Sequence, residues 1–396
     1  MPAAAKAYIA GIYEHPTRKA DGKSLAQLHA EVARGALADA GLSKSDVDGY
    51  FCAGDVAGWE RPGTGPFSII DYLGLKLRHL DTTESWGSSY LVHVAHAAEA
   101  IAARKCNVAL ITLAGRPRAE GMQTGTKTEA EAKGLDAPEA QFELPYRPTV
   151  VGLYAMCAMR HMHEFGTTSE QLAWIKVAAS HHAQHNPHAL LREVVTVVDV
   201  VNSPVIADPL HRLDCCVITD GGGALVVVSP DVAKSLNRPR VRVIGAGYAP
   251  KYQLGGRVDI TSSGAIWSGP RAFAEAGVTP ADIKYASIYD SFTITVLITL
   301  EDLGFCRKGE GGKFVADGNL IAGVGRLPVN TDGGGLCNNH PSNRGGMTKV
   351  IEAVRQLRGE AHPMVQVKNC DLALAHGTGG ALPTRHGSAT LILERE

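Results

Sequence analysis

The sequence lacks the signals of a membrane-spanning, secreted or nucleic-acid-binding protein. No apolar run approaches the roughly 18 to 20 residues that a membrane span needs. The formal net charge is −1, so no excess of basic groups favours nucleic acid or an anionic membrane as a partner. The N-terminal MPAAAKAYIAGIY leads into a strand-like run without the hydrophobic region of a signal peptide. We therefore expect a cytoplasmic protein that binds neither a membrane nor nucleic acid.

Motifs for disulfides, nucleotide phosphates and metals are also missing. The 8 cysteines contain no CxxC pair, which favours free thiols in a reducing compartment over a zinc ribbon. The glycine-rich stretches fit neither GxGxxG nor GxxxxGK[ST]. His181 and His185 are four positions apart, but no third ligand of recognisable spacing follows them. The sequence thus predicts no metal and no permanently bound cofactor.

An internal repeat predicts the architecture. A chain of 396 residues is longer than one hydrophobic core usually supports, so we expect two core units. In each half a helical pattern stops at a glycine, and a short capped turn then leads into a strand pattern. The matching residues are Gly41, Ser43 and Asp46 in the first copy, and Gly277, Thr279 and Asp282 in the second.

A second matched pair follows in the same order. HAAEAIAARKCNVALI in the first half and KVIEAVRQLRG followed by NCDLALA in the second each join an amphipathic helix to a nearly continuous apolar strand. This pattern is typical of an α/β protein whose sheet is buried on both faces by helices. We therefore predict two βαβ-rich halves, residues 1–235 and 236–396. Residues 116–205 are predicted to form a mostly helical insert, a loop domain that caps a ligand pocket.

Four short stretches carry residue types suited to catalysis. ESWGSSY, residues 84–90, opens a buried helix, where free backbone N–H groups can hold an oxyanion. Tyr289 stands where a strand pattern gives way to a helix pattern. His340 lies on a glycine-rich loop, and His376 stands at a strand end before further glycines. Tyrosine and histidine at such positions are candidates for acid–base chemistry.

Taken together, the duplicated halves and these motifs resemble the thiolase superfamily, in its sterol-carrier-protein-thiolase or lipid-transfer-protein branch. The likeness covers essentially the whole chain and rests on GGGLCNNHPSNRGG, YDSFTITVLITLEDLGFCRKGEGG, HRLDCCVITDGGGALVV and HGTGG. The resemblance implies a five-layered αβαβα fold and a homodimer built through sheet edges. It also implies coenzyme A thioesters as ligands and substrates.

Several positions depart from the family pattern. The nucleophilic cysteine of thiolases falls on Gly87, with Ser89 matching the family's serine, and no shift of one or two residues yields a cysteine. The residue of the NEAF or HDCF motif falls on Tyr289, and the GHP histidine falls on His340. The late catalytic cysteine falls on His376. In the aldolase-like pattern the position of His340 holds tyrosine, so this chain keeps the thiolase residue there.

Without a thiolate, a covalent acyl-enzyme at this turn is not expected, but the backbone N–H groups of Gly87 and Gly380 would still hold a thioester oxygen. The resemblance implies retro-aldol cleavage of a β-hydroxyacyl-CoA, which needs a base, an oxyanion site and an acid. Tyr289 would be the base if its neighbours lower its pKa from about 10. His340 would be the enolate-stabilising donor or acid, and His376 a second acid or base.

Two alternatives remain open from the sequence. A true thiolase or acyltransferase would need an unusual nucleophile, such as Cys337, Ser88 or Ser89. A catalytically silent subunit would bind acyl-CoA and leave the activity to a partner. The resemblance also suggests a small partner subunit with an OB fold and a zinc ribbon, which would join the homodimer in a heterotetramer.

Overall fold

The computed structural model describes residues 7–56, 65–123, 143–146, 148–252, 257, 259–341 and 345–396. Within these ranges one continuous sheet has the strand order β3-β2-β4-β7-β1-β8-β11-β10-β9, and β5 pairs only with β6. The strands are β1 (Tyr8–Glu14), β2 (Gly49–Phe51), β3 (His79–Asp81), β4 (Val108–Gly115), β5 (Val205–Ala207), β6 (Leu210–His211), β7 (Gly221–Val228), β8 (Val241–Pro250), β9 (Tyr285–Ile288), β10 (Leu372–Gly380) and β11 (His386–Arg395).

The sheet consists of two copies of one pattern. In the first half β2 runs parallel to β3 and β4, and β4, β7 and β1 follow one another antiparallel. In the second half β9 runs parallel to β10, and β10, β11 and β8 follow antiparallel. Val329 takes the place of β3 through a parallel bridge to Ala286 of β9. The halves meet where β1 pairs with β8, so the predicted internal repeat is confirmed.

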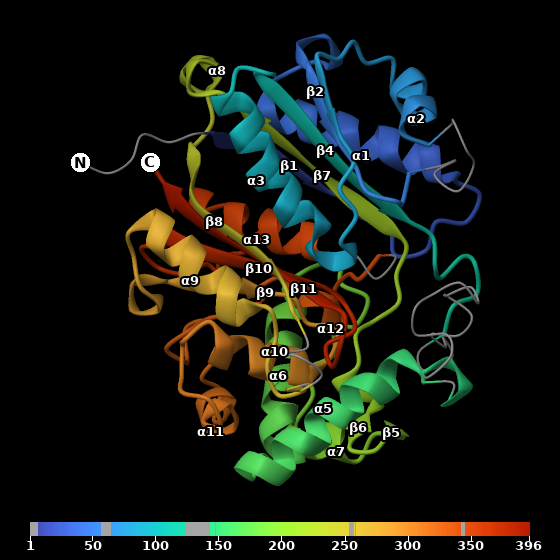
Figure 1. Ribbon diagram of the computed structural model, residues 1–396, viewed down its shortest axis with the longest axis vertical. Coiled ribbons are helices and arrows are strands. Elements are labelled where there is room, and N and C mark those ends of the chain that lie inside the picture. The colour runs from blue at the N-terminus through green and yellow to red at the C-terminus, as the bar shows by residue number, and fades with distance from the viewer. Residues whose placement is uncertain are drawn as a thin grey trace.

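Helices form three layers around the two sheet halves (Figure 1). α3 and α13 lie between the halves and share one core with residues of both. α1 packs on the outer face of the first half, and α9 and α10 pack on the outer face of the second. This is the predicted αβαβα arrangement. The helices are α1 (Leu25–Ala40), α2 (Gly65–Leu73), α3 (Ser89–Ala102), α5 (Val150–Phe165), α6 (Ser169–Ala183), α7 (Val197–Val201), α8 (Pro230–Ser235), α9 (Ala265–Ala276), α10 (Thr293–Asp302), α11 (Gly311–Val315), α12 (Gly334–Cys337) and α13 (Gly346–Arg358).

Local capping explains why the repeated segments fold alike. α1 ends at Gly41 and α9 ends at Gly277, both in the left-handed conformation that glycine adopts without strain. The carboxylate of Asp46 then accepts the backbone N–H of Ser43 at 2.8 Å. In the second copy, Asp282 accepts the N–H of Thr279 at the same distance. These turns set the direction in which each following strand enters the sheet.

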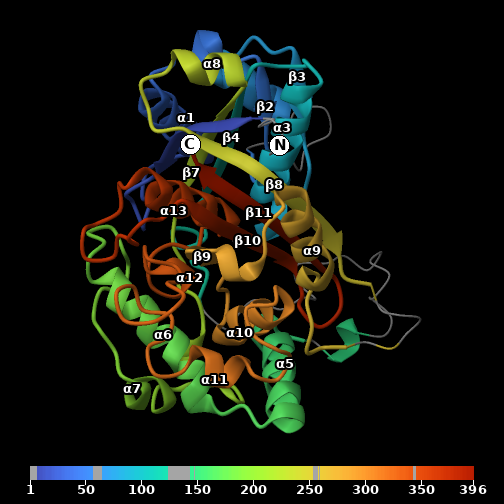
Figure 2. The same cartoon turned by 90° about the vertical axis from the view of Figure 1, so that its left-hand side faces the viewer.

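The insert packs against the second half of the chain, although it interrupts the first. α5, α6 and the β5–β6 hairpin contribute to the same core as α10, and Figure 2 shows α5, α6 and α7 at the end remote from β2 and β3. Thr168 caps α6 and accepts the N–H of Gln171. Residues 124–142 of the predicted insert lie outside the described residues.

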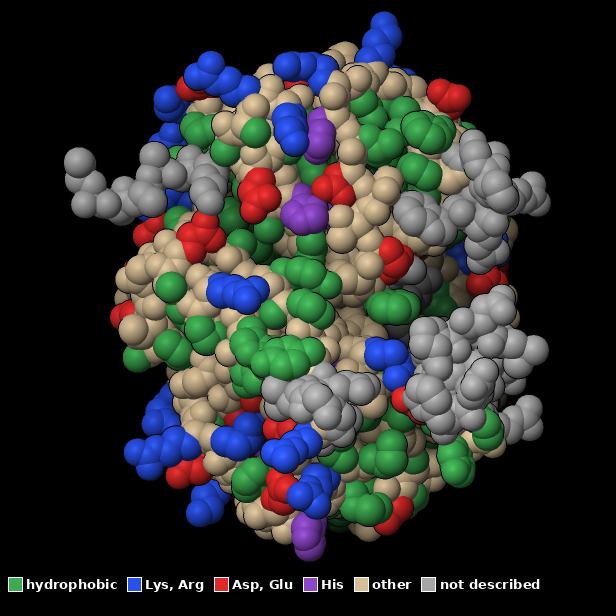
Figure 3. All heavy atoms as spheres, in the orientation of Figure 1, with side chains coloured by type: hydrophobic (Ala, Val, Ile, Leu, Met, Phe, Trp, Pro, Cys, Tyr) green, Lys and Arg blue, Asp and Glu red, His purple; other side chains and the backbone are tan. Residues whose placement is uncertain are grey.

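The surface shows neither an apolar belt nor a field of one charge sign on the face in view. Figure 3 shows basic and acidic side chains interspersed there. In the part of the chain that the structure describes, no helix is both long enough and apolar enough to cross a membrane.

Candidate active site

Two helix starts and two strand ends meet at one place in the molecule. The turn Trp86–Ser88 opens α3, and Gly345 precedes α13. A methyl group on Gly346 would lie only 1.9 Å from the carbonyl oxygen of Gly87, so the two helix starts are in direct backbone contact. Helix N-termini carry unpaired N–H groups and partial positive charge. This convergence places the partial positive charge of two helix starts at the turn formed by residues 84–90.

Tyr289 fills the space that a side chain at position 87 would need. A Cβ on Gly87 would lie 2.4 Å from Cε2 of Tyr289 and 2.3 Å from the carbonyl oxygen of Thr378. Real side chains do not approach this closely, and one of the two neighbours is backbone that cannot yield cheaply. A nucleophilic side chain is therefore excluded at Gly87 while Tyr289 keeps its place. Packing therefore favours glycine at position 87, where the resemblance to thiolases predicts the position of the nucleophile.

The phenol of Tyr289 lies between the start of α13 and the ring of His340. The two rings meet edge to face, with their centroids 5.3 Å apart. Burial raises the pKa of Tyr289 well above 10, although a hydrogen bond from the backbone N–H of Gly345 favours the phenolate. Tyr289 is thus a phenol at neutral pH. The sequence assigned Tyr289 the role of base on the condition that its neighbours lower its pKa, and that condition is not met.

The imidazole of His340 is neutral and has a free nitrogen. Burial lowers the pKa of His340 to about 4, although the carboxylate of Asp290 acts in the opposite direction. The backbone N–H of His340 donates to Oγ1 of Thr219 at 2.8 Å, which holds the loop in place. Nε2 is buried and has no hydrogen-bond partner among the described residues. At neutral pH, His340 is therefore the member of the pair that can accept a proton.

His376 does not join Tyr289 and His340, contrary to the prediction. It pairs in register with Ile288, the residue before Tyr289, so its side chain lies on the other face of the sheet. There Nδ1 bonds Oγ1 of Thr390 at 2.9 Å, and Thr390 in turn bonds Ser268 of α9. A shift of one residue along a strand moves a side chain to the opposite face of the sheet. His376 is a buried histidine under α9 rather than part of this site.

The two serines proposed as alternative nucleophiles are bound within their own turn. Oγ of Ser88 donates to the carbonyl oxygen of Ser85 at 2.8 Å. Oγ of Ser89 accepts the N–H of Ser85 at 2.8 Å and lies 3.4 Å from the carboxylate of Glu84. A serine nucleophile needs a base that takes its proton while the oxygen faces the substrate. Neither serine is arranged in this way.

Cys337, the third proposed nucleophile, is the last residue of α12, three residues before His340. Its thiol is fully buried and accepts a hydrogen bond from Nζ of Lys176 at 3.2 Å. Burial raises the pKa of Cys337, and a nucleophilic cysteine needs the opposite shift. The thiol thus contributes to the packing between α6 and the loop.

Gly380 lies beyond the part of β10 that touches the Gly87 turn. The glycines in contact with that turn are Gly377 and Gly379. The carbonyl oxygen of Gly380 instead accepts a hydrogen bond at 3.3 Å from the hydroxyl of Tyr154 in α5. Tyr154 comes from the insert and was not singled out in the sequence. Only the packing of the insert on the second half brings it here, so no local pattern marks it.

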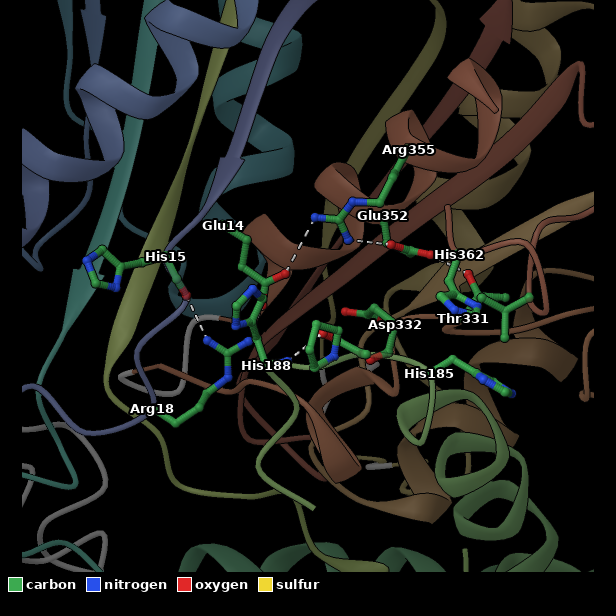
Figure 4. Close-up of a pocket in the computed structure, with 13 residues that line it drawn as sticks. Glu14, His15, Arg18, His185, His188, Thr331, Asp332, Glu352, Arg355 and His362 are labelled. Carbon is green, nitrogen blue, oxygen red and sulfur yellow. Dashed lines mark hydrogen bonds and ion pairs between the residues drawn. The ribbon is translucent and has the colours of Figure 1, made fainter. Parts of the chain in front are cut away.

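A cavity of about 230 Å³ adjoins the opposite end of the His340 loop (Figure 4). Its charged groups pair with one another. The Arg18 guanidinium donates to Glu14 at 2.8 Å and to the side-chain oxygen of Asn338 at 2.7 Å. Arg355 lies between Glu14 and Glu352. This ion-pair network ties the first half of the chain to the loop two residues before His340.

The histidines noted in the sequence as a possible metal site are arranged differently. The ring of His185 stacks on the ring of His362, with centroids 5.0 Å apart. Within the described ranges, no group of three or more histidine, cysteine, aspartate or glutamate side chains is arranged to hold a metal ion.

Five buried histidines predict a protein that loses stability in mild acid. Their pKa values in the folded protein lie below the unfolded value of about 6.5. As the pH falls, these histidines are therefore protonated in the unfolded chain before they are protonated in the folded chain, which favours unfolding. Three carboxyls with raised pKa act in the opposite direction, but they are fewer. The histidines are His93, His182 and His340, with pKa about 4, and His376 and His386, with pKa about 3; the carboxyls are Asp214, Asp302 and Glu352.

We expect the melting temperature to stay level above about pH 7 and to fall progressively from pH 6.5 to 4.5, as measured by circular dichroism. His386→Leu should flatten this dependence, because both ring nitrogens of His386 lack a partner among the described residues. A melting temperature that stays constant down to pH 4.5 would contradict the assignment of neutral buried histidines.

Comparison with known proteins agrees with the fold. The model of the family described as thiolase C-terminal domain-like matches residues 246–395. A steroid side-chain-cleaving aldolase of Thermomonospora curvata is 36% identical over 91% of each chain. A 17-hydroxy-3-oxo-4-pregnene-20-carboxyl-CoA lyase of Mycobacterium tuberculosis is 35% identical over 94% of this chain and 97% of its own. Acetyl-CoA acetyltransferases are among the further relatives.

Among solved structures, the Ltp2-ChsH2(DUF35) aldolase matches with a TM-score of 0.86 and 35% identity, over 98% of this chain and 97% of that one. The duplicated αβαβα core, with two helix starts meeting at a buried site, thus defines a protein of the thiolase fold. The chain belongs to the thiolase superfamily, in its sterol-carrier-protein-thiolase branch.

Proposed function

We infer that this chain is an enzyme that cleaves a carbon–carbon bond of a β-hydroxyacyl-CoA by a retro-aldol reaction, without a covalent acyl-enzyme. One observation carries the inference: the Tyr289 ring occupies the space of a nucleophile at Gly87, and beside it lies a neutral His340 whose Nε2 has no hydrogen-bond partner among the described residues. The names of the aldolase and CoA-lyase relatives support the same reaction.

The site suggests an exchange of the roles that the sequence assigned. Nε2 of His340 takes the proton of the β-hydroxyl, because His340 is unprotonated at neutral pH and Tyr289 is not. The bond between the α- and β-carbons then breaks. Its electron pair passes to the thioester, which becomes an enolate, and the β-carbon becomes a carbonyl carbon.

The enolate oxygen is stabilised by backbone N–H groups at the starts of α3 and α13, including that of Gly87. The Tyr289 phenol donates a hydrogen bond to the developing charge. The proton held by His340 returns to the α-carbon, which completes a shorter acyl-CoA.

The test is an assay of the purified protein, alone and with a candidate partner subunit, on β-hydroxyacyl-CoA and β-ketoacyl-CoA panels, with products followed by mass spectrometry. Cleavage of the hydroxy compounds without added coenzyme A is expected. Cleavage of the keto compounds only when coenzyme A is added would instead establish a thiolase. No turnover by the complex, together with tight acyl-CoA binding, would indicate a silent subunit.

The pH dependence of kcat/KM should report the two free-enzyme groups. Because His340 must be neutral and its pKa is about 4, the rate should persist from pH 7 down to about 5 and fall as the pH approaches 4. No alkaline loss is expected below pH 10, because burial raises the pKa of Tyr289 above that value. A limb near pH 6.5 would show an exposed, unperturbed histidine and contradict the assigned proton acceptor.

We further propose that the protein acts in the cytoplasm as a homodimer joined by a small subunit with an OB fold and a zinc ribbon. The support is that the matching solved structure is an Ltp2-ChsH2(DUF35) aldolase, whose name includes a DUF35 component. Co-expression with such a subunit, followed by light scattering, is expected to give a heterotetramer. A single 41.8 kDa species would contradict this proposal.

A further inference from the structure

Asp290, the residue after Tyr289, is connected to the His340 loop. Its Oδ1 accepts the backbone N–H of Gly335 at 2.8 Å, and its Oδ2 accepts that of Leu336 at 3.2 Å. These N–H groups belong to the first turn of α12, which leads directly to His340. Asp290 therefore caps α12.

Lys349 of α13 supplies the countercharge. Its Nζ lies 2.7 Å from Oδ1 of Asp290, and both side chains are 1% exposed. Burial opposes the charge of Lys349, but the carboxylates of Asp290, Asp332 and Glu14 together outweigh burial, so the pKa of Lys349 is raised. Two charges taken out of water are stable only as a pair with satisfied hydrogen bonds, and removing one partner leaves the other uncompensated.

This ion pair lies directly beside the imidazole of His340. A methyl group on Gly335 would meet Oδ1 of Asp290 and Cδ2 of His340 at 3.0 Å each, so a single glycine separates the carboxylate from the ring. The carboxylate raises the pKa of His340 and the ammonium lowers it. Among the described residues, the Tyr289 ring and the backbone of Gly345 also lie against the imidazole, while the Thr219 hydroxyl binds the backbone N–H of His340.

We propose that Asp290 and Lys349 are positioning residues for His340. The carboxylate holds the His340 loop against the strand that carries Tyr289, and the ammonium cancels its charge so that the imidazole stays unprotonated. This inference rests on the proposed function, in which His340 accepts a proton. A carboxylate without Lys349 would hold the loop equally well but would favour imidazolium, which cannot accept the proton.

The decisive experiment compares Lys349→Met, Lys349→Arg and the double variant Asp290→Asn/Lys349→Met. The pKa of His340 is followed in the free protein by NMR of labelled histidine, and the acid limb of kcat/KM is measured in parallel. Lys349→Met should raise both values by about one pH unit or more. Lys349→Arg, which keeps the charge, and the double variant, which has neither charge, should stay near the wild-type value.

Lys176→Met is the matched control. Lys176 is also buried and donates to the same loop, at Leu336 and Cys337, but it forms no contact with Asp290 in the described ranges. Its loss should loosen the loop and lower kcat without moving the acid limb. If Lys349→Met behaves like Lys176→Met, the pair is merely structural and the inference fails.

The NMR readout separates this inference from the proposed reaction. If the protein cleaves no β-hydroxyacyl-CoA and the His340 pKa still rises in Lys349→Met, the electrostatic role stands and the reaction is wrong. If cleavage is observed and the pKa does not move, the reaction stands and the inference is overturned. Should Lys349→Met fail to fold, a shifted His340 pKa in either Lys349→Arg or the double variant would overturn it.

Discussion

Replacing His340 with glutamine is expected to lower kcat/KM for cleavage of a β-hydroxyacyl-CoA about 10²- to 10⁴-fold, the usual contribution of a positioned acid or base. Glutamine is polar and of similar size, and its amide cannot accept the proton at neutral pH. The backbone bond from residue 340 to Thr219 does not depend on the side chain, so the loop should keep its place. Substrate affinity, measured by calorimetry with an unreactive acyl-CoA, should change little.

His376→Gln is the matched control for this variant. His376 is equally buried, but its side chain bonds Thr390 on the opposite face of the sheet, and glutamine can keep that bond. Cleavage should stay within about threefold of the wild type, even if the melting temperature falls by a few degrees. If His376→Gln lost activity as fully as His340→Gln, the sequence-based role of His376 would be restored and the assignment of faces would be wrong.

Gly87→Ala is expected to have the second large effect. Its methyl group would collide with the Tyr289 ring and with the Thr378 carbonyl, and overpacking of this kind costs about 1 to 3 kcal/mol of unfolding free energy. Because the ring must move, cleavage should fall at least about 10²-fold, as expected for a displaced catalytic group. Chemical denaturation and the cleavage assay measure the two effects separately.

The double variant Gly87→Ala/Tyr289→Ala tests whether the ring is the cause. Removing the ring should restore part of the lost stability, although the contact with Thr378 remains. Activity should not return, because the phenol is gone. Wild-type stability and activity in Gly87→Ala alone would show that the turn adapts freely, and the packing explanation for the missing cysteine would fall.

Gly87 shows what a sequence motif can predict about this site and what it cannot. Counting along the family pattern placed glycine at the nucleophile position and made a covalent mechanism doubtful. The count carried no information on what fills the space in front of that glycine. Tyr289 is 202 positions away in the chain, and only the contact between the first and second halves reveals that its ring lies against Gly87.

His376 and Tyr289 show where motif reasoning fails. Both stand near the ends of neighbouring strands, and both were assigned to one site. Successive side chains of a strand point to opposite faces, so a difference of one residue in register separates them. No spacing within either motif states the register between β9 and β10. Motif reasoning also failed to show that Tyr289 stays protonated at neutral pH. Its pKa is raised by burial, and the elements that bury it come from several parts of the chain.

The sequence by itself determined the duplicated architecture, the capped turns of each copy and the family, and it singled out Tyr289 and His340, whose rings are in contact in the structure. These features rest on local periodicity, local hydrogen bonds and motifs, which a linear chain displays directly. Only the tertiary structure decided which face each side chain takes, that Asp290 pairs with Lys349, and that Tyr154 of the insert reaches Gly380. These features depend on strand register, on burial and on charges that come from segments distant in sequence. A linear chain does not display such interactions, because they arise only when the segments are packed together.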